Sequence, residues 1–424
     1  MGIVELTKEQ FDEYTKKHQN RNFYQTSQYG TLMSRHGFTD LYIGLIDNNQ
    51  IKAASLILVK TIFGRLKYGY APRGYLVDFN DYILLRNFTA HLQKFLYKQG
   101  FIYLKMDPYV INTVRNKEGQ VIEEKNENAL IKFLKKIGYE HLGFNLYFET
   151  LKPRWNMVTK VNCSSKKLFT LFDKEVRNKI RKAERKGIMV YEGTKEELKD
   201  FYKLVQKKHT RKLDYYLDYY EIFSKEEMIS VFFVKLMPEQ YLKSSRNLYE
   251  KELNNNNLLS DKMQQQTKKN NHLLNKKMES DKVLNVYKQD LIFATKLLEH
   301  YPGGIILGTS LIIKYEKEIF FMIDGYKPKF QYFPASYLLK WKIMQKYAKE
   351  GYLYIHHNAI TGDFNETNKF LGLYQFKKGF YSNITEYIGE FNLVINRKFY
   401  SFFKDGSFVS KLVNKSLKDV KLKK

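Results

Sequence analysis

The sequence predicts an α/β fold made of two units, with a long helical insertion in the second. Strand-like apolar runs alternate along the chain with segments of helical period, which is typical of α/β layer folds. A chain of 424 residues exceeds what one hydrophobic core usually holds, so two domains are expected. Between Pro238 and Pro302 the chain contains no Pro or Gly and consists mainly of Lys, Asn, Gln, Leu and Glu, which favours uninterrupted helices.

Residues 1–150 are predicted to form the first unit. Two β-rich runs flank the turn signal Asp47-Asn48-Asn49, and a third run ends at Asp107-Pro108. Between them, apolar residues recur with a helical period. The expected elements are a helix over 11–18, strands over 41–46 and 52–62, a helix over 84–99, a strand over 101–106 and a helix over 129–137.

The second unit is predicted from residues 151–238 and 301–395, and the C-terminal segment 396–424 is expected to pack with the first unit. The same alternation of periods supports this assignment. The expected elements are a helix over 196–208, a strand over 230–236, a hairpin of buried strands over 303–313 and 318–323, a helix over 337–349, a strand over 352–356 and a last strand region over 384–395.

Residues 239–300 are predicted to form an antiparallel coiled-coil arm. Leu242, Tyr249 and Met263 lie on a seven-residue grid, as do Leu284 and the apolar residues that follow it at 291 and 298. The polar stretch 264–271 is the expected hairpin tip. Asn256 occupies a grid position, so the seam should be weak. A disordered low-complexity insertion is the alternative that the composition leaves open.

The net charge of +27 indicates a polyanionic partner, such as nucleic acid, anionic lipid or a pyrophosphate substrate. The arm carries 11 basic and 8 acidic side chains, so most of the surplus lies on the α/β body. Basic clusters occur at 166–186, 207–212 and 411–424. The alternative for each cluster is a solvated, lysine-rich surface.

The first cluster contains a helix with a basic ridge. Arg177, Arg181 and Arg185 are spaced so that they line one face, and Lys182 lies beside them. Apolar residues at 176, 180 and 183 mark the neighbouring face that anchors the helix. Because a planar guanidinium can grip phosphate oxygens, this ridge predicts contact with a phosphate backbone.

Several functional classes lack their sequence signals. One cysteine, Cys163, excludes an internal disulfide framework and a cysteine-only zinc site. The pair His356-His357 does not predict a metal site, since neighbouring residues on a strand point to opposite faces. No P-loop, GxGxxG or GxSxG motif occurs, and no cofactor is expected. Without a signal-peptide pattern or an apolar run of membrane-spanning length, the expected location is the cytoplasm.

Motifs spread along the chain indicate a specific protein family, which composition and charge do not. Residues 372–380 read GLYQFKKGF and residues 386–391 read EYIGEF, and together they resemble the C-terminal signature of the Fem (FemABX) family. Other matches to that family, in order and at compatible spacing over residues 25–391, are 71–74 (APRG) with Asp78, 103–109 (YLKMDPY), the basic helix 177–183, 332–341 with its Tyr337 and Trp341, and 362–364 (GDF).

The resemblance implies two acyltransferase-like (GNAT-like) domains with a coiled-coil arm. It also implies a reaction in which an aminoacyl group, glycine or else serine or alanine, passes from aminoacyl-tRNA to an amine of the lipid-linked peptidoglycan precursor (lipid II). The enzyme would then work at the inner face of the membrane as a peripheral protein. Other Fem-type transferases or a second copy of the chain are further candidate partners.

The resemblance also implies roles for individual residues. Lys377, beside Phe376, would stabilise the oxyanion of the reaction, and Asp107 would accept or orient a proton of the incoming amine. The alternatives are a surface lysine and a turn-forming aspartate. The expected precursor-binding residues are Arg73, Arg211, Tyr215 and Tyr332, and the expected tRNA-binding residues are Arg177, Arg181, Lys182 and Arg185.

The chain departs from the family pattern at three places. Met33 stands where related proteins often have a Lys, Asp324-Gly325 replaces a Gly-Gly strand end, and Leu371 replaces an acidic residue. These changes bear on which amino acid is added, or indicate a paralogue that confers resistance to a bridge-cleaving endopeptidase. A non-catalytic RNA-binding protein and a scaffold protein are the alternatives from other functional classes.

Overall fold

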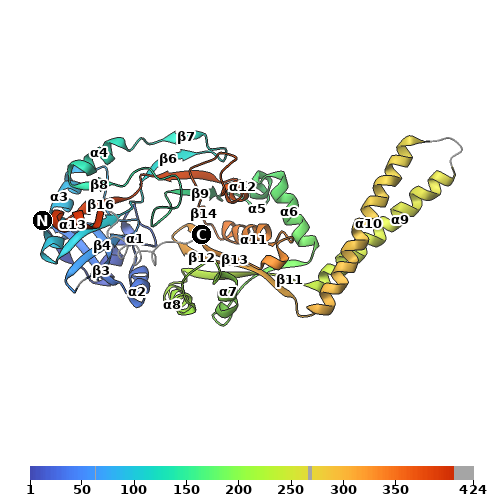
Figure 1. The fold of residues 1–424 in the computed structure, drawn as a ribbon, viewed down its shortest axis with the longest axis horizontal. Helices are drawn as coiled ribbons and strands as arrows, with labels where there is room; N and C mark the ends of the chain where they lie inside the picture. The colour runs from blue at the N-terminus through green and yellow to red at the C-terminus, as the bar shows by residue number, and fades with distance from the viewer. Residues whose placement is uncertain (63, 266–269, 405–424) are drawn as a thin grey trace.

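Two mixed β-sheets form the body, and a pair of long helices projects from the second sheet's side (Figure 1). The computed structural model describes residues 1–62, 64–265 and 270–404, and the basic segment 411–424 lies outside them. The alternation of strands and helices confirms the predicted α/β class. None of the described helices is both long and apolar enough to cross a lipid bilayer.

The first sheet has seven strands, and only its β4–β5 pair is parallel. In sheet order the strands are β1 (Gly2–Glu5), β2 (Thr39–Asp47), β3 (Gln50–Ile62), β4 (Leu66–Ala71), β5 (Phe101–Met106), β16 (Phe391–Val394) and β8 (Tyr139–His141). The helices of this part are α1 (Lys8–Lys17), α2 (Ser27–Arg35), α3 (Tyr82–Lys98), α4 (Asn128–Lys136) and α13 (Arg397–Lys404).

The second sheet has nine strands, with β13–β14 as its parallel pair. In sheet order they are β10 (Ile188–Glu192), β11 (Ile229–Leu236), β12 (Ile305–Tyr315), β13 (Glu318–Tyr326), β14 (Tyr354–Ala359), β9 (Trp155–Lys160), β15 (Asn383–Tyr387), β6 (Ile111–Arg115) and β7 (Val121–Glu124). Its helices are α5 (Ser165–Leu171), α6 (Lys174–Arg185), α7 (Leu198–Val205), α8 (Leu213–Ser224), the 3₁₀ turn η1 (Pro328–Phe330), α11 (Ala335–Lys349) and α12 (Leu371–Lys378).

Strand pairing crosses the predicted boundaries between the two units. The β6–β7 hairpin, whose residues fall in the range predicted for the first unit, extends the second sheet through β15, while β16 returns to the first sheet. The predicted last strand region is therefore two strands in different sheets. Gly389, with a φ of +99°, lies in the turn between them, and a Cβ atom there would come within 3.2 Å of the Gly143 carbonyl oxygen.

One hydrophobic core is shared by the two units. It joins Phe23 and Tyr29 from the first unit to Phe201, Tyr216 and Tyr219 from α7 and α8. An ion pair of 2.7 Å between Arg35 and Asp218 links α2 to α8 at the surface. Near the C-terminal end, the Tyr400 ring on α13 contacts that of Tyr103 on β5, with centroids 5.5 Å apart. The halves are thus joined by a continuous core rather than by a loose linker.

The insertion forms two antiparallel helices, α9 (Pro238–Gln264) and α10 (Asn271–His300), which pack along each other (Figure 1). At its base, Lys186, which directly follows α6, donates a hydrogen bond to Asp290 at 2.9 Å. Midway along the arm, Asn256 is buried and donates to Ser280 at 3.1 Å. The grid position predicted to weaken the seam is therefore a hydrogen-bonded polar layer. Supercoiling of the pair stays a prediction, and part of its expected tip lies outside the described residues.

Candidate active site

Lys377 lies in the wall of a cavity of about 560 Å³, here called the Lys377 cavity. Its walls come from β13, β14, α12, the segment leading into α11 and the loop that follows α7. The charged and aromatic lining residues are Lys208, His209, Phe321, Asp324, Tyr326, Lys327, Phe330, Phe333, His357, Phe370, Phe376 and Lys377. A mainly apolar cavity with a few polar groups is the usual form of a substrate site.

The Lys377 ammonium is held by the backbone of β14. Its Nζ donates a 2.7 Å hydrogen bond to the carbonyl oxygen of Ala359, and the residue is 8% exposed. Burial, and then the charge of Lys340, lowers the pKa of Lys377 to about 7, against the opposing charge of Asp324. A cation fixed in this way is suited to meeting negative charge that develops in a reaction.

Close packing against α6 positions the helix that carries Lys377. Gly379 ends α12, and a Cβ atom there would lie 2.4 Å from a methyl group of Val176. The Asp173 backbone N–H also donates to the Gly379 carbonyl oxygen at 3.0 Å. Phe376, which lines the cavity, contacts Tyr337 with ring centroids 4.9 Å apart. The signature around Lys377 therefore encodes a packing contact as well as a cation.

An ion pair between a buried lysine and a cavity-lining aspartate lies in the wall of the Lys377 cavity. Lys340 of α11 is 3% exposed and donates to Asp324 of β13 at 2.7 Å. The Ser310 hydroxyl donates to the same carboxylate oxygen, also at 2.7 Å. Motif matching noted Asp324 as a departure but missed Lys340. Lys340 falls within an expected helix, but nothing in the sequence indicated that it is buried, because a single lysine in a helix is usually exposed.

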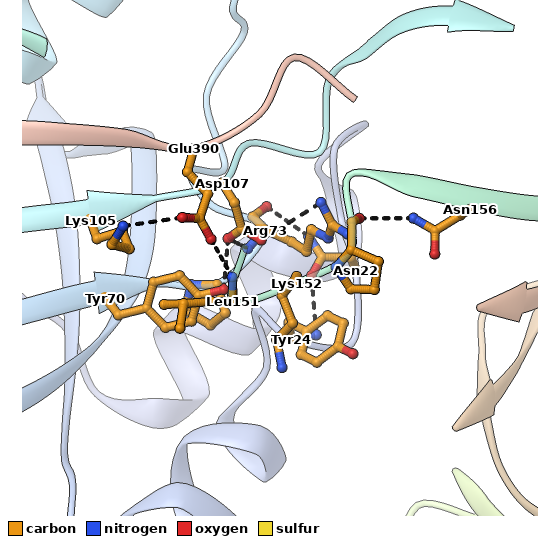
Figure 2. A network of polar contacts seen from close by, with 12 residues as sticks. Asn22, Tyr24, Tyr70, Arg73, Lys105, Asp107, Leu151, Lys152, Asn156 and Glu390 are labelled. Atoms are coloured by element: carbon orange, nitrogen blue, oxygen red, sulfur yellow. Dashed lines mark hydrogen bonds and ion pairs between the residues drawn. The ribbon is translucent and has the colours of Figure 1, made fainter. Parts of the chain in front are cut away.

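Asp107 is at the centre of a separate buried network in the first unit (Figure 2). Its Oδ1 accepts a hydrogen bond from the Arg73 backbone N–H at 2.8 Å and another from the Tyr70 hydroxyl at 2.9 Å. The Arg73 guanidinium lies 3.7 Å from Oδ2. Burial raises the pKa of Asp107 to about 6, although the charge of Arg73 opposes the shift.

Lys152, which sequence reasoning missed, joins this network. It is 3% exposed, lies 4.2 Å from the centroid of the Tyr24 ring and donates to the Tyr29 hydroxyl at 3.3 Å. Burial lowers the pKa of Lys152 to about 7. The available signal was the sequence Lys-Pro-Arg at 152–154, where two cations flank a proline at the start of the second unit.

Arg211 and Tyr215 approach the same network from α8 and the loop before it. The Arg211 guanidinium lies over the Tyr215 ring, 3.8 Å from its centroid. The charges of Asp107, Arg211 and Arg73 all act on Lys152. Three predicted precursor-binding residues and Asp107 are therefore gathered around one buried lysine, although they come from distant parts of the chain.

A small pocket of about 40 Å³, here called the Arg73 pocket, lies beside this network and shares wall residues with the Lys377 cavity. Arg73, Tyr24 and Tyr387 line it. Phe321, Met322 and Asn358 are lining residues of both hollows. Consequently the network around Asp107 and the Lys377 ammonium lie on either side of a wall that β13 and β14 form.

Tyr332 lies apart from the other predicted precursor-binding residues. It is 54% exposed, and its ring packs on Phe333 and on Phe293 of the arm, with centroids 4.7 and 5.7 Å away. It is not among the described residues that line either hollow. Tyr332 follows η1, which directs it toward the base of the arm. Met33, one of the three departures from the family pattern, is buried in the shared core.

The basic ridge of α6 has the predicted geometry. Val176, Ile180 and Ala183 are buried, as predicted for the anchoring face. Arg181, Lys182 and Arg185 are exposed, Arg177 is half-buried, and none of the four forms an ion pair with a described residue. The helix is linked to the Lys377 cavity through Tyr337: Lys179 donates to its hydroxyl at 3.1 Å, and the Tyr337 ring contacts Phe376, which lines the cavity.

The paired histidines have separate partners. His356 lies 3.2 Å from Glu318, and His357 lies 2.9 Å from the Thr159 hydroxyl. Over the part of the chain that the structure describes, no group of three or more His, Cys, Asp or Glu residues is arranged to hold a metal ion.

Comparison with known proteins gives consistent matches over nearly the whole chain. The model of the FemAB family matches residues 6–405. The chain is 24% identical to the aminoacyltransferase FemA of Staphylococcus epidermidis, covering 95% of this chain and 98% of FemA. It is 27% identical to the lipid II:glycine glycyltransferase of the same species, over 94% of each. The crystal structure of FemX superposes with a TM-score of 0.73 at 19% identity, covering 95% of this chain and 99% of FemX.

Proposed function

This chain belongs to the FemAB family and is an acyltransferase, and from that premise we propose that it transfers an amino acid from aminoacyl-tRNA to an amine of the lipid-linked peptidoglycan precursor. The product is a longer interpeptide bridge. We favour glycine as the transferred amino acid, with serine and alanine next. A relative named as a glycyltransferase acting on lipid II supports both the amino acid and the acceptor.

The observation that carries this proposal is the buried ammonium of Lys377 in its cavity. The neutral acceptor amine attacks the ester carbonyl carbon, and a C–N bond forms while the carbonyl oxygen becomes an oxyanion. The Lys377 ammonium stabilises that oxyanion. The C–O bond to the tRNA ribose then breaks, and the amine proton ends on the ribose oxygen. Aminolysis of an activated ester needs mainly such positioning and charge stabilisation, and aminoacyl-tRNA serves as co-substrate without a further cofactor.

The network around Asp107, across the shared wall from Lys377, is suited to binding the acceptor substrate, the lipid-linked precursor. Arg73 lies beside Asp107, and the charges of Asp107, Arg73 and Arg211 all act on Lys152, so basic side chains gather in this network. Lipid II carries a diphosphate, and guanidinium groups bind phosphate oxygens well. Asp107 is 2% exposed and lies across the shared wall from Lys377, so in this proposal it orients Arg73 for the diphosphate and does not take the proton of the attacking amine. In this proposal the peptide of the precursor reaches from this network past Phe321 to Lys377.

The α6 ridge suits the tRNA backbone, since its exposed cations have no acidic partner among the described residues and the helix packs beside the Lys377 cavity. Because lipid II is embedded in the inner leaflet, we expect the protein to work in the cytoplasm as a peripheral protein of the membrane surface. The arm offers a surface for self-association or for another Fem-type transferase.

The test is direct transfer. Purified protein is incubated with lipid II and, in turn, glycyl-, seryl- and alanyl-tRNA, and the precursor is weighed by mass spectrometry. The expected result is a mass gain of one amino-acid residue with one of these tRNAs. An unchanged precursor with every charged tRNA, from protein that still binds tRNA, would contradict the proposal and favour an RNA-binding or scaffold role.

A further inference from the structure

Asp324 is the only acidic side chain among the described residues that line the Lys377 cavity. The other charged lining residues are Lys208, Lys327 and Lys377. Asp324 lies near the end of β13, and its side chain is 34% exposed. A lone carboxylate among lysines marks the one place in the cavity where a cationic group of a ligand would be attracted.

The carboxylate is held by one oxygen. Lys340 and Ser310 both donate to Oδ1, each at 2.7 Å, and Lys340 is almost completely buried. No donor on the described residues reaches Oδ2, and Oδ2 is not one of the polar atoms sealed from solvent without a partner. One oxygen is therefore anchored to the protein, and the other is open to the cavity.

An aminoacyl ester presents two sites of opposite charge close together. The carbonyl oxygen becomes negative as the acceptor amine attacks, while the adjacent carbon carries an α-ammonium group. Lys377 stabilises the first charge but repels the second. We propose that Asp324 binds the α-ammonium group of the aminoacyl moiety and thereby turns the ester carbonyl toward Lys377. This inference rests on the proposed function and adds a determinant of donor recognition to it.

Asp324 stays ionised, and an ionised carboxylate binds the ammonium group of the donor better than the neutral amine of the acceptor. Burial raises the pKa of Asp324, but the charge and hydrogen bond of Lys340 outweigh it, so the net shift is downward. A carboxylate with a lowered pKa is a poor proton acceptor and a good partner for an ammonium group. Asp107, with its raised pKa, has the opposite character.

Binding at Asp324 also has a chemical consequence. The ion pair keeps the α-amine protonated, so this amine cannot act as a nucleophile while its ester is activated. Only the acceptor amine then attacks the ester. The site should therefore select α-amino acyl groups against α-hydroxy acyl groups of the same size, which lack the cation.

The experiment compares glycyl-tRNA with glycolyl-tRNA, prepared from it by deamination, as donors to lipid II. If serine or alanine is the residue transferred, the corresponding pair is used. The wild-type protein should prefer the aminoacyl donor by about 10- to 100-fold in kcat/KM, as expected for a hydrogen bond to a charged group. In Asp324→Asn the preference should fall to about 1, because only the aminoacyl donor loses an ion pair with the carboxylate, whereas any change in the charge of Lys377 affects both donors alike.

Lys340→Met is the matched control, since it breaks the same ion pair but leaves the carboxylate. Because the carboxylate remains, the preference for the aminoacyl donor should remain, while any change in rate that comes from the altered pKa of Lys377 should be the same for both donors. Equal use of both donors by the wild-type protein, or an unchanged preference in folded Asp324→Asn, would overturn the inference but leave the proposed function standing. No transfer from any charged tRNA would overturn both. The ratio of kcat/KM for the two donors in the wild-type protein tests the inference even if a variant does not fold.

Discussion

The Lys377 ammonium lies 2.7 Å from the carbonyl oxygen of Ala359, in a protein where most lysines point into water. The carbonyl fixes the direction of the ammonium, while burial removes the solvent that would otherwise screen its charge. One of the three ammonium protons is used in this bond, and the others remain for a ligand. The contact joins α12 to β14, so the position of the cation depends on how these two elements pack.

Replacement of Lys377 by Met should abolish most of the transfer activity. Met fills a similar volume without a charge, so the oxyanion loses its stabilising cation. We expect kcat/KM to fall by about 10²- to 10³-fold while the Kd for tRNA stays unchanged. Lys378→Met is the matched control, because Lys378 does not line the cavity and contacts Glu118 at 3.9 Å and the Tyr374 ring instead. Similar losses in both variants would contradict the role of Lys377.

The pH dependence of transfer should report the titration of Lys377. Its pKa is lowered from 10.5 to about 7, so the ammonium form predominates below that pH and is lost as the pH rises through it. The wild-type kcat/KM should therefore show a limb that falls above pH 7, after correction for spontaneous ester hydrolysis. Lys377→Arg keeps its charge at any such pH and should lack this limb. A falling limb that persists unchanged in Lys377→Arg would assign it to another group.

Loss of the Asp107 carboxylate should destabilise the first unit. Asp107→Ala leaves the Arg73 guanidinium buried without its carboxylate, and we expect the free energy of unfolding to fall by about 3 to 5 kcal/mol. Tyr70→Phe removes one hydrogen bond to the same carboxylate and should cost about 1 kcal/mol. Urea titration at neutral pH measures both. Equal losses would mean that the Arg73 pair contributes little.

The α6 ridge should govern the salt dependence of tRNA binding. The double variant Arg181→Gln/Arg185→Gln removes two exposed cations, and the slope of log K against log salt should become shallower by about 1 to 2 units. Lys94→Gln/Lys98→Gln on α3 is a control that removes the same charge from another face. Filter binding over a range of salt concentrations gives the slopes. A steep slope retained in the α6 variant would place the tRNA elsewhere.

A methyl group at Gly379 should disturb the helix that carries Lys377. The added Cβ would lie 2.4 Å from the Val176 methyl, and we expect Gly379→Ala to lower the free energy of unfolding by about 1 to 3 kcal/mol and to reduce transfer. The second change Val176→Ala should restore part of both. Gly372→Ala is the matched control on α12, because no atom lies within 4 Å of its new Cβ. Thermal unfolding and the transfer assay check these outcomes.

Local sequence patterns were sufficient for the elements with a strong period. The predicted strand 101–106 coincides with β5, and the predicted helix 84–99 corresponds to α3 within a few residues. The buried and exposed faces of α6 follow from its spacing. These features depend on neighbours three or four residues apart, which the sequence displays directly.

The sequence patterns did not indicate which distant strands pair with each other. The expected strand 384–395 gave no sign that β15 and β16 would join different sheets, because register and partner are chosen by contacts across the whole fold. The placement of Tyr332 toward the arm has the same cause.

By itself, the sequence determined the α/β class, the helical insertion, the basic face of α6 and the family to which the chain belongs. The tertiary structure alone decided that Lys152 lies with Asp107 and that Lys340 lies behind Asp324. A lone lysine reads as a solvated surface group, and only the packing of distant elements around it removes the water and brings an aspartate close enough to act on its charge.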